Sequence, residues 1–355
     1  MDAGVTHNGW PIGRWLIWIV KALVGFVALV HLYALILMIA PVPGTANMAG
    51  RILQGTPVYH TWVPLEEMSP HLVRAVIAAE DTRFCQHTGV DVDAIKDAWH
   101  EHIVLVFHDQ TLGVEEHKAF AGAFGEVGKH MRPKKIRNEA AELGPNVMLV
   151  SNIRENGKPI GSLPDGEMMF HSDTPYRERP DKATTLYAIE IPKTGGNTIF
   201  ANCYMAAETL PDDVKRTLAG RKAMHVFEYG AVTKESRFDR STAPHFAQPV
   251  FRKHPVTGRT ALYVSELMTE EIIGLPEDES RDMLAFLFEH QAQTQFQHEH
   301  VWQVDDLVLW DNRCSIHART DFPETERRKL RRMTVIDENP VLAGDPPGLN
   351  EVAAE

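Results

Sequence analysis

The sequence is organised around the stretch Phe170-His171-Ser172-Asp173-Thr174-Pro175-Tyr176. If this stretch is a β-strand, side chains two residues apart lie on the same face, so His171 and Asp173 point in one direction. A second stretch, Trp310-Asp311-Asn312-Arg313-Cys314-Ser315-Ile316-His317, supplies another histidine. Two imidazoles and one carboxylate on one face of a metal leave the opposite positions open, which is the arrangement of non-haem Fe(II) oxygenases. The sequence therefore predicts a metal site made of His171, Asp173 and His317.

A His-x-Asp pair is a weak signal by itself, because the chain has 18 histidines and a solvated strand face can show the same spacing. Its context strengthens it. From about Val92 to Asn339 the chain resembles the taurine/2,4-D (TauD/TfdA) family of Fe(II)- and 2-oxoglutarate-dependent dioxygenases. The motifs that carry the resemblance occur in the family's order: Val104 to Gln110, Phe124-Gly125, His171-Ser172-Asp173, Gly195-Gly196-Asn197-Thr198, Trp310-Asp311-Asn312-Arg313, His317, and Arg327-Arg328-Lys329-Leu330-Arg331-Arg332.

The resemblance implies Fe(II) as the metal, 2-oxoglutarate as the cosubstrate and O2 as the oxidant. Arg328 matches the arginine that binds the far carboxylate of 2-oxoglutarate, and Thr198 matches its hydroxyl partner. Arginine suits this role because its planar guanidinium can meet a carboxylate through two parallel hydrogen bonds. The implied reaction hydroxylates a small, anionic organic substrate and releases succinate and CO2.

Three further residues are candidates for the substrate site. Arg332 matches a residue that meets an anionic substrate group in some family members. Asn152 and Tyr176 are candidates for the substrate wall, with packing as the alternative for both. The alternative for the whole arginine cluster is a solvated run of charge, which is the commoner meaning of such a run.

The N-terminal part has a different character. A polar tail at residues 1–13 is followed by a run at residues 14–40, which is apolar from residue 22 onward except for His31. Its length predicts a bilayer-spanning helix, with a signal peptide or a buried helix as alternatives. Arg14 and Lys21 favour the cytoplasmic side for its start, which makes the chain a single-pass inner-membrane protein with its catalytic domain outside the cytoplasm. The alternative is a cytoplasmic enzyme, because Fe(II) and 2-oxoglutarate are scarce outside.

Residues 41–91 contain the motif Glu80-Asp81-Thr82-Arg83-Phe84-Cys85-Gln86-His87-Thr88-Gly89. This segment resembles the start of a monofunctional biosynthetic peptidoglycan transglycosylase of glycosyltransferase family 51. In that family the first acidic residue is the catalytic carboxylate, which would be Glu80, and a general base for a sugar hydroxyl makes chemical sense there. The alternative for Glu80 is a carboxylate at a helix end. A truncated membrane-anchored glycosyltransferase and an inactive fusion product are therefore the competing interpretations of the whole chain.

The pattern of secondary structure predicts a mainly β fold with helices. Many short strands and a few covering helices over residues 92–340 favour a double-stranded β-helix, or jelly roll. We expect a turn at Asp305-Asp306, where an aspartate tolerates left-handed backbone. Residues 228–247 show no periodicity and predict a long loop. Residues 341–355 predict a flexible tail.

The composition of the chain indicates which classes of binding partner are expected. The net charge of −12 argues against nucleic acid, because phosphate binding needs a basic surface. Cys85, Cys203 and Cys314 lie far apart and form no CxxC motif, which favours free thiols over a disulfide framework. The expected partners are a small-molecule substrate and, through the N-terminal helix, a lipid bilayer. The sequence leaves the oligomeric state open between a monomer and a homo-oligomer.

Overall fold

The structure is a computed structural model that describes residues 21, 23–29, 91–129, 143–162, 167–227 and 243–349. The chain divides into two compact units, Met1–Gln86 and His87–Glu355. In the first unit residues 23–29 are helical and exposed. No helix within the described ranges is long and apolar enough to cross a membrane. Most of the membrane helix predicted over residues 14–40 lies outside these ranges, as does Glu80, so both remain predictions.

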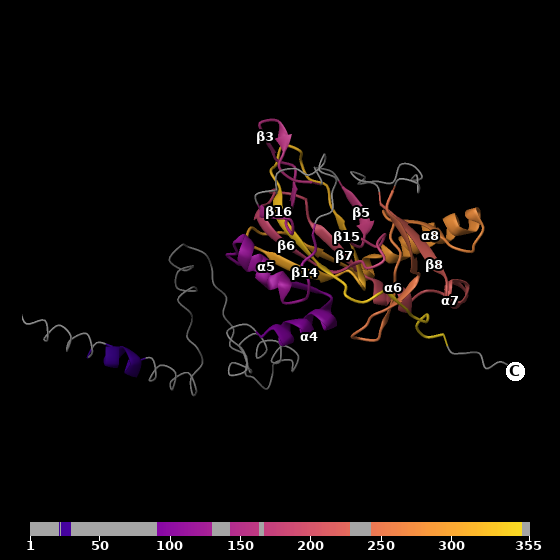
Figure 1. Ribbon diagram of the computed structural model, residues 1–355, viewed down its shortest axis with the longest axis horizontal. Helices are drawn as coiled ribbons and strands as arrows, with labels where there is room; N and C mark the ends of the chain where they lie inside the picture. The colour runs from indigo at the N-terminus through magenta and orange to yellow at the C-terminus, as the bar shows by residue number, and fades with distance from the viewer. Residues whose placement is uncertain are drawn as a thin grey trace, which may run out of the picture. The chain divides into compact units, whose positions relative to one another are not determined.

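The second unit is built on a five-stranded antiparallel sheet (Figure 1). Its strands, in spatial order, are β1 (Val104–Phe107), β14 (Leu307–Asp311), β6 (Asp181–Glu190), β16 (Lys329–Ile336) and β2 (Met148–Ser151). Every residue of β14 is buried, which explains its nearly continuous apolar sequence. Successive side chains of a strand face opposite sides, so Leu309 and Trp310 enter two different cores.

A four-stranded antiparallel sheet packs against the inner face of the first. Its order is β13 (Gln297–His300), β7 (Thr198–Asn202), β15 (Ser315–Arg319) and β5 (Met168–His171). Phe200 of this sheet shares one hydrophobic cluster with Leu186, Trp310 and Leu330 of the five-stranded sheet. The rings of Phe200 and Trp310 are 5.4 Å apart between centroids. Burying each such aromatic side chain contributes about 1.5–3 kcal/mol, so this cluster holds the two sheets together.

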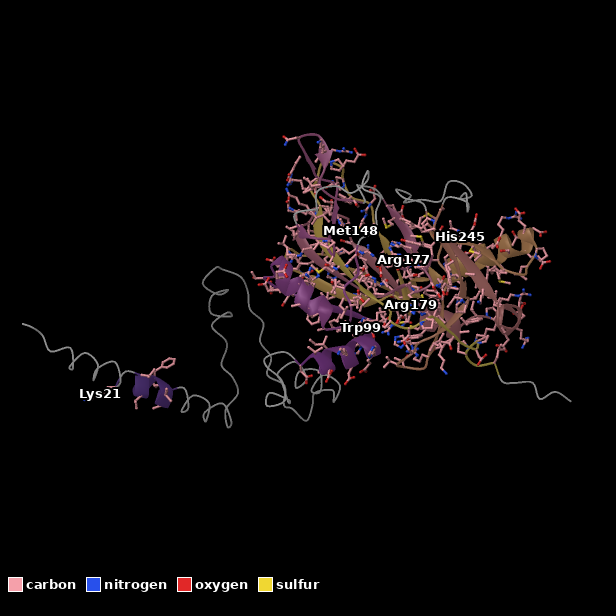
Figure 2. All side chains as sticks on the ribbon, in the orientation of Figure 1. Lys21, Trp99, Met148, Arg177, Arg179 and His245 are labelled. Carbon is pink, nitrogen blue, oxygen red and sulfur yellow. The ribbon has the colours of Figure 1, made fainter. Side chains whose placement is uncertain are left out.

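Two helices cover the outer face of the five-stranded sheet. They are α4 (Val92–His102), in which Asp91 caps the N-terminus by accepting a hydrogen bond from Ala94 N at 2.9 Å, and α5 (Val114–Gly122). Trp99 of α4, labelled in Figure 2, lies in a hydrophobic cluster with Ala121 of α5 and Leu309 of β14. The second apolar face of the sheet is therefore also buried.

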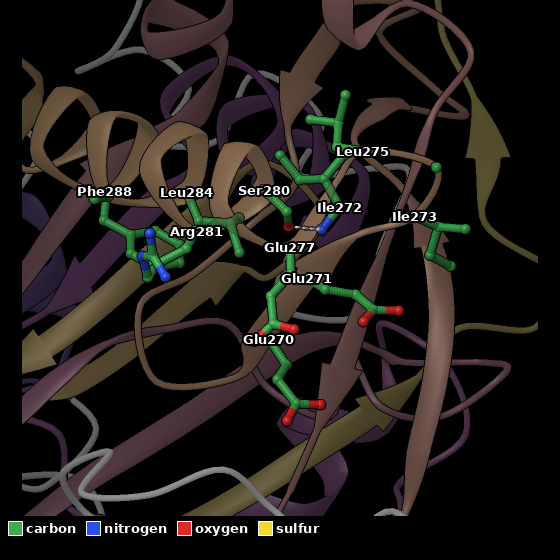
Figure 3. A pocket seen from close by; sticks show the side chains of 12 residues that line it. Glu270, Glu271, Ile272, Ile273, Leu275, Glu277, Ser280, Arg281, Leu284 and Phe288 are labelled. Atoms are coloured by element: carbon green, nitrogen blue, oxygen red, sulfur yellow. Dashed lines mark hydrogen bonds between the residues drawn. The ribbon is translucent and has the colours of Figure 1, made fainter.

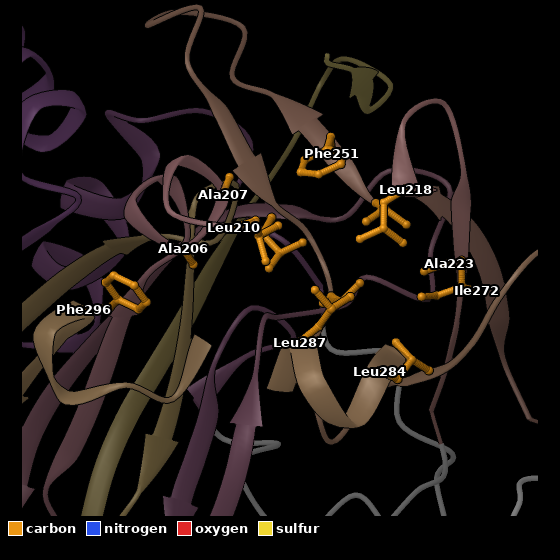
Figure 4. Packing of buried hydrophobic residues seen from close by; sticks show 13 residues of the cluster. Ala206, Ala207, Leu210, Leu218, Ala223, Phe251, Ile272, Leu284, Leu287 and Phe296 are labelled. Carbon is orange, nitrogen blue, oxygen red and sulfur yellow. The ribbon is translucent and has the colours of Figure 1, made fainter. Parts of the chain in front are cut away.

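The remaining elements form a separate hydrophobic cluster beside the two sheets (Figure 4). Its buried members include Leu218, Phe251, Leu284 and Leu287. The contributing elements are α6 (Cys203–Glu208), α7 (Asp212–Leu218), β8 (Lys222–Val226), β10 (Phe251–Lys253), β11 (Thr260–Leu262), β12 (Thr269–Ile272), α8 (Glu277–Gln291) and a 3-10 turn at Thr294–Phe296. Strand β9 (His245–Pro249) pairs with β8 and adds no residue to the cluster. A short hairpin, β3 (Arg154–Glu155) and β4 (Lys158–Pro159), completes the connection between β2 and β5.

Several local expectations can be compared with the structure. Asp305 has φ +69, so the left-handed turn is confirmed. The aperiodic loop expected at residues 228–247 is wrong at its end, because β9 begins at His245 and pairs along its length with β8. Within the predicted tail of residues 341–355, Leu342–Ala343 forms β17, which pairs with the open edge of β10; the flexibility of the tail stays a prediction. Cys203 and Cys314 are buried free thiols, as expected.

Helix α5 is joined to the sheet by a buried polar chain. Nε of Arg331 donates to Nδ1 of His117 at 3.1 Å, and Nε2 of His117 lies 2.8 Å from Oγ1 of Thr185. Since Arg331 can only donate, Nδ1 of His117 accepts and its proton is on Nε2. Burial, together with the charge of Arg331, lowers the pKa of His117 to about 3.

This chain predicts a loss of stability in mild acid. Between about pH 6.5 and pH 3 the unfolded chain binds a proton at His117 and the folded chain does not, so the free energy of unfolding falls as the pH falls, by up to about 1.4 kcal/mol per unit. The variant His117→Gln keeps both hydrogen bonds without titrating. Denaturant unfolding at several pH values gives the free energy of unfolding of each chain as a function of pH. As the pH falls, the unmodified chain should lose more of this free energy than His117→Gln does. An equal loss in both chains would contradict the prediction.

Candidate metal centre and cosubstrate pocket

The two predicted histidine ligands face each other across adjacent strands. His317 of β15 is paired directly with His171 of β5, and their ring centroids are 4.2 Å apart. Asp173 joins them: the potential ligand atoms of all three residues lie within 4.8 Å of one another. The expectation that His171 and Asp173 share one strand is wrong in detail, because β5 ends at His171 and Thr174 adopts φ +55. Asp173 therefore reaches the site from a bend.

The histidines have the protonation state that metal binding requires. Nδ1 of His171 lies 2.9 Å from the carbonyl oxygen of Met169 and donates to it, which leaves the lone pair of Nε2 free. Nδ1 of His317 is buried and has no hydrogen-bond partner among the described residues. Burial lowers the pKa of both rings, and for His171 the charge of Asp173 opposes this only in part. Both imidazoles are therefore neutral near pH 7.

Asp173 is held ionised at the same place. Its carboxylate accepts a hydrogen bond from the hydroxyl of Thr184 and forms an ion pair with Arg332, with 2.6 Å between Oδ1 and Nη2. Burial by itself would raise its pKa, but the charge of Arg332, the largest of the opposing effects, and the hydrogen bond from Thr184 help to hold the pKa of Asp173 below its usual range. Thr184 accepts from Nδ2 of Asn312 at 2.9 Å. Thr184 and Asn312 thus position the carboxylate of Asp173, a role that the sequence analysis missed although Asn312 lies in a motif it quoted.

The donor set fits a divalent iron ion. Two neutral imidazoles and one carboxylate converge in a buried site, which is the ligand set of mononuclear non-haem Fe(II) enzymes. A second group, His254, Asp311 and Cys314, is equally compact but differently bonded. Asp311 accepts from Nε and Nη2 of Arg313 at 2.9 and 2.6 Å, and from Nε2 of His254 at 3.1 Å. Burial raises the pKa of Cys314 well above its ordinary value, so this group is a closed hydrogen-bonded network.

Arg328 is a buried cation beside the metal site. Its side chain donates from Nε and Nη2 to the carbonyl oxygen of Gly196 at 3.2 and 3.1 Å. Burial, with a smaller contribution from the charge of Arg319, lowers the pKa of Arg328 to about 9, so it is charged at neutral pH. In the described part of the chain no carboxylate pairs with it. A buried guanidinium in this state needs an anion, because an unpaired buried charge is unfavourable.

One cavity brings together six of the predicted site residues. His171, Asp173 and His317 line it, as do Thr198, Arg328 and Arg332. Oγ1 of Thr198 accepts from Nε1 of Trp302 at 3.0 Å, which orients the hydroxyl. Nη1 of Arg332 also contacts Sδ of Met148 at 3.4 Å. Arg319 lines the same cavity and was not predicted.

Asn152 and Tyr176 lie around this cavity without lining it. Asn152 accepts from the backbone N of Arg328 at 3.0 Å and donates to the carbonyl oxygen of Glu326 at 2.8 Å, so it fixes the start of β16. The ring of Tyr176 stacks on Phe227 at 4.8 Å within an apolar cluster that includes Met168 and Met268. A substrate-wall role for either residue stays a prediction.

A larger hollow lies elsewhere, between β12 and α8 (Figure 3). It measures about 560 Å³, against about 60 Å³ for the metal-site cavity. Its lining is apolar with glutamates and Arg281, and the hydroxyl of Ser280 accepts from the backbone N of Ile272 at 2.7 Å. Cavity size therefore does not point to the candidate site, whereas the set of potential metal ligands does.

The turn that presents the Gly196 carbonyl requires glycine. Gly195 has φ +71, and a Cβ atom there would lie 2.1 Å from the carbonyl oxygen of Asp321. The variant Gly195→Ala should lower the free energy of unfolding by at least about 2 kcal/mol, from left-handed strain plus backbone displacement. The control Gly258→Ala has the same φ of +71 with open space around it. Denaturant unfolding should show a clearly smaller loss for the control; equal losses would mean that the Asp321 contact is unimportant.

The chain is similar to several known proteins. The family model described as "Taurine catabolism dioxygenase TauD, TfdA family" matches residues 67–334. The chain is 32% identical over 263 residues to the alpha-ketoglutarate-dependent 2,4-dichlorophenoxyacetate dioxygenase of Burkholderia sp. (strain RASC), covering 69% of this chain and 86% of that protein. It is 32% identical over 266 residues to pentalenolactone F synthase of Streptomyces arenae, covering 70% and 87%.

A solved structure is similar as well. The crystal structure of AAD-2 in complex with Mn(II) and N-oxalylglycine superposes with a TM-score of 0.61 at 30% identity, covering 72% of this chain and 92% of that chain. The family match begins at residue 67 and so includes part of the segment that the sequence analysis assigned to a transglycosylase-like fragment. The comparisons do not support that assignment or the glycosyltransferase alternative.

Proposed function

The chain belongs to the taurine catabolism dioxygenase TauD, TfdA family and is an Fe(II)/2-oxoglutarate-dependent dioxygenase, and from this premise we propose that it hydroxylates a small, anionic organic substrate. The products would be the hydroxylated substrate, succinate and CO2. One observation carries the proposal: the His171, Asp173 and His317 ligand set shares a cavity with Arg328, a buried cation that has no carboxylate partner within the described ranges.

The protein's contribution is to hold and orient the reactants. Fe(II), when bound by His171, Asp173 and His317, supplies the reduction of O2 that is coupled to decarboxylation of 2-oxoglutarate and oxidation of one substrate C–H bond. Arg328 and the hydroxyl of Thr198 are placed to hold the far carboxylate of the cosubstrate. Asn152 supports this by fixing the backbone of Arg328. The apolar walls of the cavity exclude water, which strengthens each of these charged contacts.

Arg332 and Tyr176 support the anionic character proposed for the substrate. Arg332 lines the metal-site cavity, and the neighbouring Tyr176 belongs to the apolar cluster with Met168, Leu267 and Met268. A cation beside an apolar surface suits an organic acid with an apolar body. The Burkholderia relative, whose name gives 2,4-dichlorophenoxyacetate as its substrate, acts on a molecule of this type.

The wider organisation is proposed on the same basis. We propose that the two packed antiparallel sheets form a double-stranded β-helix, with the metal centre between β5 and β15 of the smaller sheet. Anchoring of the chain to a bilayer through residues 14–40, and assembly into a homo-oligomer, stay predictions.

The test is succinate release by the full chain with Fe(II), 2-oxoglutarate and O2. We expect slow release without substrate, and faster release with an organic acid such as 2,4-dichlorophenoxyacetate. Its amide is the matched neutral control and should not stimulate release. Absence of both succinate release and 2-oxoglutarate binding would overturn the assignment of the reaction, and equal stimulation by the acid and the amide would overturn the anionic substrate.

A further inference from the structure

Arg319 adds a second guanidinium to the cosubstrate end of the cavity. It follows His317 by two residues on β15, so alternation places both on the inward face. Across the sheet it is paired with Thr198 of β7 on one side and with Met168 of β5 on the other. The side chain is 6% exposed and lines the cavity. Arg319 therefore stands next to Thr198, one of the two residues proposed to hold the cosubstrate.

Arg319 is also close to Arg328, the other residue proposed to hold the cosubstrate. The guanidinium carbons of Arg319 and Arg328 lie 5.5 and 5.9 Å from the centroid of the same ring, that of Phe322. Among the described residues, the side chain of Arg328 donates only to the carbonyl oxygen of Gly196. The carboxylate of Asp173, which lines the same cavity, is already paired with Arg332.

Two guanidinium groups at one end of a buried cavity are like charges and repel each other. The positive charge of Arg319 contributes to lowering the pKa of Arg328, which is the sign of this repulsion. A carboxylate that binds between the guanidinium groups of Arg319 and Arg328 would be attracted by both. The arrangement therefore favours a ligand that carries a carboxylate at this end, away from the metal.

We propose that Arg319 binds the far carboxylate of the cosubstrate together with Arg328 and Thr198, and so makes the site select dicarboxylic 2-oxo acids over monocarboxylic ones. This inference rests on the proposed function and adds a residue and a selectivity to it. The alternative role of Arg319 is structural, as a packing partner of Phe322, and a structural role would weaken the binding of every 2-oxo acid alike.

The experiment measures binding, without turnover, to the full chain loaded with Mn(II) under anaerobic conditions. Calorimetric titration compares 2-oxoglutarate with 2-oxobutyrate, which has the same 2-oxo acid group but no second carboxylate. For Arg319→Gln we expect the Kd of 2-oxoglutarate to rise about 10- to 100-fold, as for loss of one partner of a buried charge pair. The Kd of 2-oxobutyrate should change less than about twofold. Arg319→Lys, which keeps the charge but not the planar fork, should fall between Arg319→Gln and the unmodified chain.

The matched control is Arg327→Gln, because Arg327 is exposed and pairs with Glu190 outside the cavity. It should leave both affinities unchanged. Equal weakening of both ligands by Arg319→Gln, or no weakening of 2-oxoglutarate, would overturn the proposal while the proposed function stands. If Arg319→Gln does not fold, an unchanged Kd of 2-oxoglutarate in Arg319→Lys overturns it. If the unmodified chain binds neither ligand, the proposed function fails first and the role of Arg319 fails with it.

Discussion

Replacing His317 by alanine should weaken binding of Fe(II), or of Mn(II) as a redox-stable probe, by at least about 100-fold. Loss of residues that merely orient metal ligands typically costs 10- to 100-fold, and His317 is itself one of three proposed ligands. The loss should appear in a calorimetric titration of the full chain and should also abolish succinate release. His171→Ala should behave in the same way, because the two rings are paired across β5 and β15.

The control for this prediction is His298→Ala, which removes an exposed histidine from strand β13 and should leave metal affinity unchanged. Unaltered metal binding in His317→Ala would contradict the assignment of the centre. If His317→Ala still bound one metal ion per chain, the second group of His254, Asp311 and Cys314 would be the next candidate for the metal site.

Replacing Arg328 by glutamine should raise the Kd of 2-oxoglutarate by on the order of 100-fold, equivalent to about 3 kcal/mol, because truncation of one partner of a buried charge pair costs roughly 2–5 kcal/mol. The same arginine predicts a pH dependence. Its pKa is about 9 in the free protein, so it is charged below that pH and loses its charge above it. The affinity of the unmodified chain for 2-oxoglutarate should therefore be constant near neutrality and fall above about pH 9.

Arg328→Gln should lack this alkaline fall, and that difference separates a charge effect from general damage. Arg327→Gln, the neighbouring exposed arginine, is the control and should bind as tightly as the unmodified chain at every pH. A 2-oxoglutarate affinity that is the same in Arg328→Gln would show that another cation holds the cosubstrate.

The convergence of His171, Asp173 and His317 on one cavity could be predicted from the sequence, because the order of several motifs carries information that a single motif does not. More than 140 residues of sequence separate His171 and Asp173 from His317, yet the succession of motifs around them predicted that the three belong to one site. Local geometry was harder to predict. Asp173 was expected on a strand, but Oγ1 of Thr174 accepts from the backbone N of Asp181 at 2.8 Å and the chain bends there. No periodicity in the sequence reports such a contact.

Residues that act through long-range contacts escaped the sequence analysis for the same reason. Thr184 lies in a mostly buried strand, and its hydroxyl acquires a role only because Asp173 reaches it from a bend. In the sequence nothing distinguishes Arg319 from the other basic residues. Only the strand pairing, which places it opposite Thr198, shows that it belongs to the cavity. Strand β9 has no alternation of its own, because its backbone pairing with β8 defines it. By contrast, the turn at Asp305 depends on a local backbone preference and was predicted correctly.

The direct pairing of His171 with His317 makes the centre sensitive to how the two strands are aligned. A bulge interrupts this ladder between His317 and Arg319, where two steps on β15 match three on β5. A shift of β5 by one residue would turn His171 to the opposite face, since strand side chains alternate. Insertions or deletions in the short strand Met168–His171 would then erase metal affinity while most of the surrounding sandwich stays folded. Metal affinity would thus report the alignment of these two strands, which unfolding measurements alone would not detect.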